Sequence, residues 1–238
     1  MSAVLYSVAD GVATLTLNRP ESRNALNLEM CDGLIESATS AFKDPSVKIF
    51  FVRASGPVFC AGADLKERQG MSEAQVRERR MKGFAAYAAL EALPMPSIAV
   101  VHGPAVGSGC EIAGACDFIV ATPAASFRTP EATRGTVGAT QRLPRILGKR
   151  LAKDMMFTGR TLTAEEAREA GLVSRLVSDL DPELEKIAKT ILDAPPDALR
   201  LAKRVIDRGV ELDPKGALEA EIEAIEEQLA AGQWMGKK

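Results

Sequence analysis

Two glutamates in turn-forming stretches are the residues of this sequence best suited to acid/base chemistry. Glu111 ends the stretch GPAVGSGCE (Gly103–Glu111), and Glu131 follows 20 residues later in SFRTPEATRG. Two carboxylates beside one anion-stabilising site can hold a water molecule and relay a proton. Each glutamate is equally suited to the first turn of a helix, where an acid is favourable. Spacing alone therefore leaves both interpretations open.

The segments around these acids offer a backbone with few bulky side chains. The stretch before Glu111 holds three glycines, and a similar stretch, FCAGADLKE (Phe59–Glu67), also follows an apolar run. Glycines at the start of a helix let a ligand approach free N–H groups closely. Two such turns can aim two N–H groups at one carbonyl oxygen, which is the geometry of an oxyanion hole.

Other catalytic motifs are incomplete in this chain. A nucleophile elbow around Ser108 needs glycines where Val106 and Cys110 stand. A phosphate-binding loop in LPRILGKR needs a glycine in place of Leu143. Because His102 is the single histidine and the cysteines form no CxxC pair, we expect no metal site.

The composition excludes several classes of partner. The chain has 238 residues, 46% of them hydrophobic and 26% charged, with a formal net charge of −2. This balance gives no electrostatic reason to expect nucleic acid or an anionic membrane as a partner. No apolar run reaches the roughly 18 residues of a membrane span, and the N-terminus lacks the pattern of a signal peptide. Free thiols then favour the cytoplasm.

Strand and helix patterns alternate through the first two thirds of the chain. Residues 3–8 and 12–17 flank Asp10-Gly11, a hairpin signal, and Asn27 is a suitable N-cap for a helix that runs to about Phe42. This order predicts an α/β fold. The other elements expected here are strands over 48–55, 97–103 and 118–127 and helices over 72–92 and 110–117.

The last third of the sequence is mostly helical, with one short strand at 171–177. Its final helix carries apolar residues at helical spacing, namely Leu218, Ile222, Ile225 and Leu229. That spacing fits a helix packed on the chain's own core or a contact between subunits. The helices expected in this part are 139–157, 163–169, 181–193, 196–209 and 214–231.

Taken in order, the motifs strongly resemble the crotonase superfamily, and most closely its enoyl-CoA hydratases. The resemblance is carried by GPAVGSGCEIAGACD, by FCAGADLKE before it and by SFRTPEATRG and ATQRLPRILGKRLAKDMMFTGRTLTAEEAREAGLVSRLV after it. The stretch LNRPESRNALN near the N-terminus adds to the likeness, which runs from about residue 4 to residue 232.

The resemblance implies a fold, a substrate class and an assembly. The fold would be a spiral of ββα units that forms two roughly perpendicular sheets. Residues 1–190 would form this core with its acyl-CoA site, and residues 191–238 a C-terminal helical region that packs subunits into a homotrimer or a homohexamer. The substrate would be an acyl-CoA thioester of fatty acid β-oxidation, so coenzyme A is part of the substrate and no separate cofactor is implied.

The resemblance also assigns residue roles by position. Ala63 and Ser108 would supply the two oxyanion-hole N–H groups. Glu111 and Glu131 would be the catalytic pair, with Glu131 carrying the proton of the α-carbon and Glu111 activating water. The other positions expected to border the substrate or its coenzyme are Arg23, Ala25, Ala61, Gly62, Asp64, Leu65, Lys66 and Gly107.

The walls of an acyl pocket are expected from the helix over 67–93 and from the stretch after Glu131. Apolar side chains available there are Met71, Met81, Phe84 and Tyr87, although each fits the hydrophobic core equally well. Arg128 lies close to the same turn. Its side chain would contact an acidic acyl group, or else face solvent or a backbone carbonyl.

The activity implied by the resemblance is reversible hydration of a 2-enoyl-CoA. Isomerisation or another crotonase-type lyase reaction remains an alternative, as does non-catalytic binding of acyl-CoA. Two features depart from the family pattern. Ser108 stands where glycine is common, and the stretch GTVGATQRL is a few residues shorter than usual, which could displace Glu131.

Overall fold

The computed structural model describes residues 2–232. It begins with the expected hairpin, in which β1 (Val4–Ala9) pairs antiparallel with β2 (Val12–Leu17). The turn residues Asp10 and Gly11 have φ values of 50° and 82°. These left-handed conformations are the ones that a tight two-residue hairpin turn requires.

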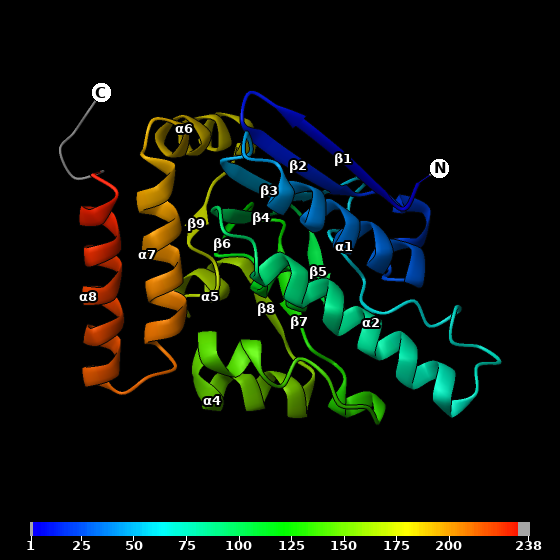
Figure 1. Cartoon of the computed structure of the whole chain (residues 1–238). Helices are drawn as coiled ribbons and strands as arrows, with labels where there is room; N and C mark the ends of the chain where they lie inside the picture. The colour runs from blue at the N-terminus through cyan, green and yellow to red at the C-terminus, as the bar shows by residue number, and fades with distance from the viewer. Residues whose placement is uncertain (1, 233–238) are drawn as a thin grey trace.

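The hairpin continues into a six-stranded sheet that forms the centre of the molecule (Figure 1). Its other strands are β3 (Ile49–Ala54), β4 (Ser97–Val101), β6 (Phe118–Ala121) and β9 (Arg175–Leu176). The strand order is β1-β2-β3-β4-β6-β9, and every neighbouring pair after the hairpin is parallel. Strands β3 and β4 were recognisable as continuous apolar runs because a parallel sheet is buried on both faces.

A second, three-stranded sheet has the order β5-β7-β8. It consists of β5 (Pro104–Val106), β7 (Ser126–Arg128) and β8 (Thr161–Thr163). Strand β4 in the large sheet leads directly to β5 in the small one, and β6 leads in the same way to β7. The expected α/β fold with two sheets is confirmed, although the sequence did not predict β5 or β8 as strands, because each has only three residues.

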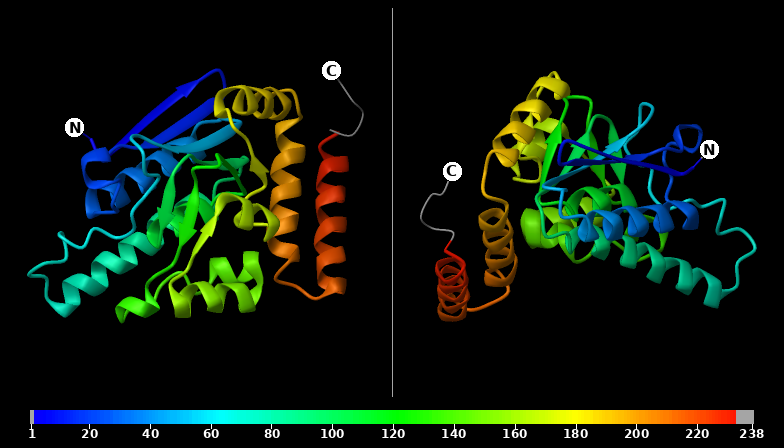
Figure 2. Two further views of the ribbon diagram at one scale, coloured as in Figure 1. Left: turned by 180° about the vertical axis from the view of Figure 1, so that it is seen from behind. Right: turned by 45° about the horizontal axis from the view of Figure 1, so that its top comes forward.

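Helices cover the large sheet on both faces. On one face, Leu184 and Ile187 of α6 pack against Phe51, Ile98 and Val120 of the sheet. The other face packs into the main core with α1 and α2, which lie side by side in Figures 1 and 2. The helices of this part are α1 (Leu28–Lys43), α2 (Glu73–Glu91), α3 (Ser108–Gly114), α4 (Arg142–Thr158), α5 (Ala164–Glu169) and α6 (Leu180–Leu192).

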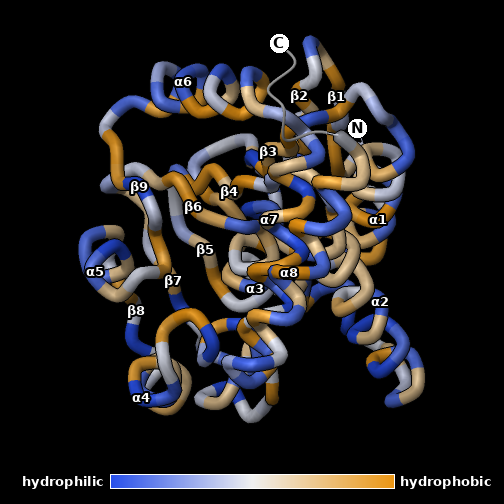
Figure 3. Tube along the Cα trace, turned by 60° about the vertical axis from the view of Figure 1, so that its left-hand side comes forward, coloured by the Kyte–Doolittle hydropathy of each residue, from blue (hydrophilic) through white to orange (hydrophobic). Residues whose placement is uncertain are grey.

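Helix boundaries follow the capping chemistry of the sequence. The side chain of Asn27 accepts a hydrogen bond from the N–H of Met30 at the start of α1. Ser72 and Gln75 form a reciprocal capping box at the start of α2. Figure 3 shows hydrophobic residues along β4 and β6 in the interior, whereas the outer end of α2 is largely hydrophilic.

The chain ends in a helical hairpin of α7 (Pro196–Gly209) and α8 (Pro214–Ala230), which stands beside the body in Figures 1 and 2. An ion pair of 2.8 Å between Lys203 and Asp117 joins α7 to the body. None of the helices described combines the length and the apolar character needed to span a bilayer.

The apolar residues of α8 do not pack on the chain's own core. Leu218, Ile222, Ile225 and Leu229 are 46–57% exposed, so the interpretation that placed them in the core of this subunit is wrong. The helix buries small residues, Ala220 and Ala224, instead. A contact between subunits remains a prediction for this exposed face.

A buried asparagine ties the segment before α1 to the end of β3. Asn24 is fully buried, and its side-chain oxygen accepts a hydrogen bond from the backbone N–H of Arg19 at 2.8 Å. Its side-chain amide donates to the carbonyl oxygens of Ser55 and Val58, both at 2.8 Å. The residues that precede Ala61 are therefore fixed against the N-terminal segment.

We predict that Asn24→Ala lowers the free energy of unfolding by about 2–5 kcal/mol, because it leaves several buried backbone groups without partners. The matched control is Asn18→Ala, which removes bonds in a partly exposed setting and should cost less than about 1 kcal/mol. Chemical denaturation measures both. Equal losses in the two variants would contradict the structural role given to Asn24.

Candidate active site

A cavity of about 460 Å³ lies between α2, the segment after β3, the start of α3 and the segment that joins β7 to α4. These parts of the chain are far apart in the sequence. The fold brings eight of the predicted site residues to this one cavity: Ala61, Gly62, Ala63, Leu65, Gly107, Ser108, Glu111 and Glu131.

The backbone N–H of Ala63 is free to bind a ligand. Its neighbours are engaged, because Leu26 donates to the carbonyl oxygen of Gly62 at 2.8 Å and accepts from the N–H of Asp64 at 2.8 Å. In extended backbone the polar groups of successive residues point in opposite directions. The N–H of Ala63 therefore points away from Leu26, and it has no acceptor among the described residues.

The N–H of Ser108 is the second free donor at the cavity. Ser108 is the first residue of α3, and the first N–H groups of a helix have no partner within it. The preceding Gly107 has φ 52° and ψ −107°, a conformation that glycine tolerates far better than other residues. Burial raises the pKa of the Tyr87 phenol, and the nearby Ser108 hydroxyl only partly offsets the rise.

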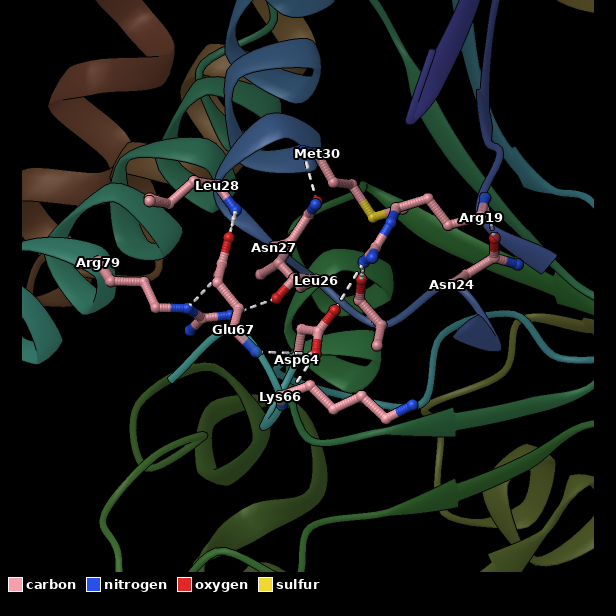
Figure 4. A network of polar contacts seen from close by, with 11 residues as sticks. Arg19, Asn24, Leu26, Asn27, Leu28, Met30, Asp64, Lys66, Glu67 and Arg79 are labelled. Carbon is pink, nitrogen blue, oxygen red and sulfur yellow. Dashed lines mark hydrogen bonds and ion pairs between the residues drawn. The ribbon is translucent and has the colours of Figure 1, made fainter. Parts of the chain in front are cut away.

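A polar network holds the Ala63 segment in place (Figure 4). Asp64 accepts hydrogen bonds from Arg19 at 3.0 Å and from the N–H of Lys66 at 3.0 Å. Burial raises the pKa of Asp64, but these bonds and that from the N–H of Glu67 outweigh it, so its pKa lies below the ordinary value. The carboxylate faces Arg19, and Asp64 is not among the residues that line the cavity.

Glu67 extends this network to α2. One of its carboxylate oxygens accepts the N–H of Leu28 at 2.8 Å, and the other accepts Nε of Arg79 at 2.5 Å. Arg79 is 5% exposed and also donates to the carbonyl oxygen of Leu26, the residue that pairs with the Ala63 segment. The network thus connects α1, α2 and the segment that carries one of the two free N–H groups (Figure 4).

Glu111 lies in the first turn of α3 with a side chain that is 6% exposed. Its Oε2 accepts a hydrogen bond from Arg142 at 3.0 Å, whereas its Oε1 is buried and has no partner. Burial raises the pKa of Glu111, the Arg142 guanidinium lowers it, and the charge of Glu91 raises it. The net pKa is above the usual value for a glutamate.

Glu131 also lines the cavity, where it lies against two glycines. A Cβ added to Gly107 would stand 2.3 Å from Oε1 of Glu131, and one added to Gly138 would stand 3.1 Å from its Cγ. Oε2 is buried without a partner. Burial is the main cause of the raised pKa of Glu131, and the charge of Glu111 adds to it. The short stretch after Glu131 therefore leaves this side chain in the cavity.

The arrangement offers two kinds of unpaired polar group to one ligand. Glu111 and Glu131 each keep a buried oxygen without a partner, and Ala63 and Ser108 each keep a free N–H. Buried polar atoms are almost always paired, so unpaired ones need an explanation. A ligand with a carbonyl oxygen and an adjacent water molecule would pair all four groups.

Other predicted residues stand outside the cavity. Arg23, Ala25 and Lys66 do not line it, so their expected contact with a coenzyme stays a prediction. Arg128 donates to the carbonyl oxygen of Gly159 at 2.7 Å. For Arg128 the interpretation in which it binds a backbone carbonyl is confirmed.

Some residues of the site were not predicted from the sequence. Arg142 and Gly138 contact the two glutamates, but nothing in their spacing from Glu111 or Glu131 signals this. Among the apolar candidates, Phe84 and Tyr87 line the cavity, and Met71 does not.

A second cavity of about 780 Å³ adjoins the first and is lined by Met81. The two cavities share Arg80, Phe84, Glu111 and residues 137–139 as walls.

Comparison with known proteins agrees with the sequence motifs. Residues 7–233 match the family model described as enoyl-CoA hydratase/isomerase. A crotonyl-CoA hydratase of Syntrophomonas wolfei is 36% identical over 227 residues, which cover 93% of this chain and 87% of the relative.

Solved structures show the same likeness. An enoyl-CoA hydratase of Bacillus anthracis has a TM-score of 0.90 at 36% identity, covering 94% of this chain and 90% of that one. A Thermobifida fusca protein solved in complex with CoA has a TM-score of 0.89 at 26% identity, covering 97% and 94%.

The contact between Gly107 and Glu131 gives a test of the site geometry. We predict that Gly107→Ala lowers the free energy of unfolding by about 1–3 kcal/mol more than Gly171→Ala, because only the former overpacks a neighbour. Gly171 also has a positive φ, of 82°, but nothing lies within 4 Å of an added Cβ. In a Glu131→Ala background the part of the excess that comes from this contact should disappear, so the excess should shrink. Additive losses in the double variant would show that the two residues do not touch.

Proposed function

Because the chain belongs to the enoyl-CoA hydratase/isomerase family, we propose that it is an enoyl-CoA hydratase that adds water reversibly across the 2,3-double bond of a 2-enoyl-CoA thioester. The observation that carries this proposal is that two carboxylates, each with a buried oxygen that has no partner, lie at one cavity with two free backbone N–H groups. Coenzyme A is part of the substrate, and the reaction needs no other cofactor.

The two N–H groups bind the thioester carbonyl oxygen. As water attacks, the π electrons of the double bond move toward this oxygen, and the donors of Ala63 and Ser108 stabilise the negative charge that develops there. Both donors belong to ordered backbone, one fixed by pairing with Leu26 and the other at the start of a helix. Little reorganisation is then needed during the reaction.

The two glutamates move the protons. Oε1 of Glu111 accepts a proton from water while the water oxygen bonds to the β-carbon, and the protonated carboxyl of Glu131 delivers a proton to the α-carbon. Burial raises the pKa of both glutamates, but a guanidinium bonded to Glu111 offsets part of that rise, whereas the charge of Glu111 adds to the rise at Glu131. One proton must then pass from Glu111 back to Glu131 to restore the starting state.

Two alternatives are kept for the same cavity. A double-bond isomerase would also use the oxyanion hole, but it has no need for a second carboxylate placed to bind water. A protein that only binds acyl-CoA has no need for either carboxylate to be buried beside the thioester, where burial destabilises the charged forms. The pair of glutamates therefore favours hydration.

We also propose an assembly and a location. The exposed apolar face of α8, formed by Leu218, Ile222, Ile225 and Leu229, supports a homotrimer or a homohexamer in which a second copy covers it. A cytoplasmic location stays a prediction from the free cysteines of the sequence.

The second cavity supplies room for the acyl chain. It begins at Phe84 and Glu111, which it shares with the first cavity, and continues along α2 past Met81 and Ala88. Its position next to Glu111 suits the part of an acyl group that follows the β-carbon. We propose that it holds the tail of the acyl group.

The first test of the proposed function uses crotonyl-CoA. The parent should give a product heavier by one water, whereas conversion of a 3-enoyl-CoA to the 2-enoyl isomer without hydration of crotonyl-CoA would mean isomerisation. Glu111→Gln and Glu131→Gln should each lower kcat/KM by about 10²–10³-fold or more, because each removes a proton carrier. Glu36→Gln, an exposed change on α1, is the control and should keep the parent rate. Near-parent hydration by Glu131→Gln would overturn the assignment.

The second test concerns the acyl chain. Ala88 lines only the second cavity, so Ala88→Trp should lower the ratio of kcat/KM for 2-decenoyl-CoA to that for crotonyl-CoA by about tenfold or more, because several buried CH₂ groups lose their contacts. Ala85→Trp, on the same helix but outside both cavities, should leave the ratio unchanged. An unchanged ratio in Ala88→Trp would remove the acyl tail from this cavity.

A further inference from the structure

Arg142 is a buried cation shared between two carboxylates. It is the first residue of α4 and is 7% exposed. Its Nε and Nη2 donate to the two oxygens of Glu91 at 3.2 and 2.6 Å, and its Nη1 donates to Oε2 of Glu111 at 3.0 Å. Its guanidinium also lies 5.8 Å from the ring centre of Tyr87. Glu91 thus holds the guanidinium through Nε and Nη2, while Nη1 is left to donate to Glu111.

This contact gives the two oxygens of Glu111 different environments. Oε2 is held by Arg142, while Oε1 is buried and unpaired. The carboxylate is therefore anchored at one oxygen and offers the other to a ligand. A bond from a guanidinium also favours the charged carboxylate, since charge-assisted hydrogen bonds are stronger than neutral ones.

The charges that face Glu111 come from three directions. Arg142 approaches from α4, Glu91 and Tyr87 from α2, and Glu131 from the segment after β7. On its own helix, the only other titratable neighbour is the buried thiol of Cys110. The strands packed against α3, which are β4, β5 and β6, carry no titratable side chains. Arg142 is thus the only described cation bonded to Glu111.

We propose that Arg142 is a positioning residue that keeps Glu111 ionised and fixed through Oε2, so that Oε1 serves as the base toward water. This inference rests on the proposed hydratase function and extends it to a residue outside the reacting groups. Glu91 has two effects on this arrangement. It orients Arg142 by accepting two of its hydrogen bonds, and its own charge acts against ionisation of Glu111.

The proposal predicts that Arg142→Met and Glu91→Gln shift the pKa of Glu111 in opposite directions. Arg142 lowers the pKa of Glu111, so Arg142→Met should raise it, and Glu111 should remain protonated to higher pH. Glu91→Gln keeps an oxygen that can accept from Arg142 and removes the charge that raises the pKa of Glu111, so it should lower that pKa. A purely structural role, in which Arg142 only joins α4 to α2, would not move the titration of Glu111 in opposite directions.

The direct test is an NMR titration of the protein with ¹³C in its glutamate carboxyl carbons. The Glu111 resonance is assigned by its loss in Glu111→Gln. Its midpoint should move to higher pH in Arg142→Met and to lower pH in Glu91→Gln. Arg145→Met removes the same charge from an exposed site on the same helix and should not move it. This readout does not depend on turnover, so it separates a failure of this inference from a failure of the hydratase assignment.

The pH at which kcat/KM for crotonyl-CoA falls on the acid side should shift in the same directions as the Glu111 midpoint in these variants. Below its midpoint the ionised fraction falls about tenfold per pH unit, so Arg142→Met should lose most activity at low pH and recover part of it at high pH. Arg142→Lys keeps the charge and should shift this pH less. If Arg142→Met does not fold, the Glu91→Gln shift decides. Midpoints that stay at the parent value, or move in the same direction in Arg142→Met and Glu91→Gln, would overturn the proposal.

Discussion

The structure depends on keeping two carboxylates at one cavity, each with a buried oxygen that has no partner. A buried acceptor without a partner costs about 1–3 kcal/mol, and burial raises the pKa of both Glu111 and Glu131. A raised pKa in the folded state stabilises the fold at low pH, and this contribution is lost as the pH rises through the folded value. The two glutamates therefore weaken the fold at neutral pH, and the surrounding elements must hold them in place.

The elements around the cavity hold these groups in different ways. Glu131 lies against the bare backbone of Gly107, where an added Cβ would collide with it, and of Gly138, where an added Cβ would crowd it. Glu111 lies in the first turn of α3 and is anchored by Arg142. The free N–H of Ala63 is aimed by backbone pairing on its other side and by the network of Figure 4. Segments that are distant in the sequence are thus brought to one cavity by contacts with glycine backbone, with Arg142 and with Leu26.

Much of this could be predicted from the sequence, because local chemistry and motif order carried it. The hairpin turn at Asp10-Gly11, the cap at Asn27 and the glycine stretch before Glu111 each have a local physical cause that the structure confirms. Long-range contacts could not be predicted in this way. The bond from Arg142 to Glu111 joins residues 31 positions apart, and it arises from how α4 meets α3 rather than from any pattern along the chain.

The prediction that the apolar face of α8 packs on the chain's own core was wrong for a related reason. Helical spacing of apolar residues shows that a face will be covered, but it does not say by which chain.

Four groups, the two N–H groups and the two glutamates, must meet around one substrate, and a crystal structure with a bound acyl-CoA thioester tests this most directly. The account predicts the thioester oxygen within about 3 Å of the N–H groups of Ala63 and Ser108, with Glu111 and Glu131 on either side of the β-carbon. A carbonyl bound elsewhere, or either carboxylate turned away from it, would contradict the account.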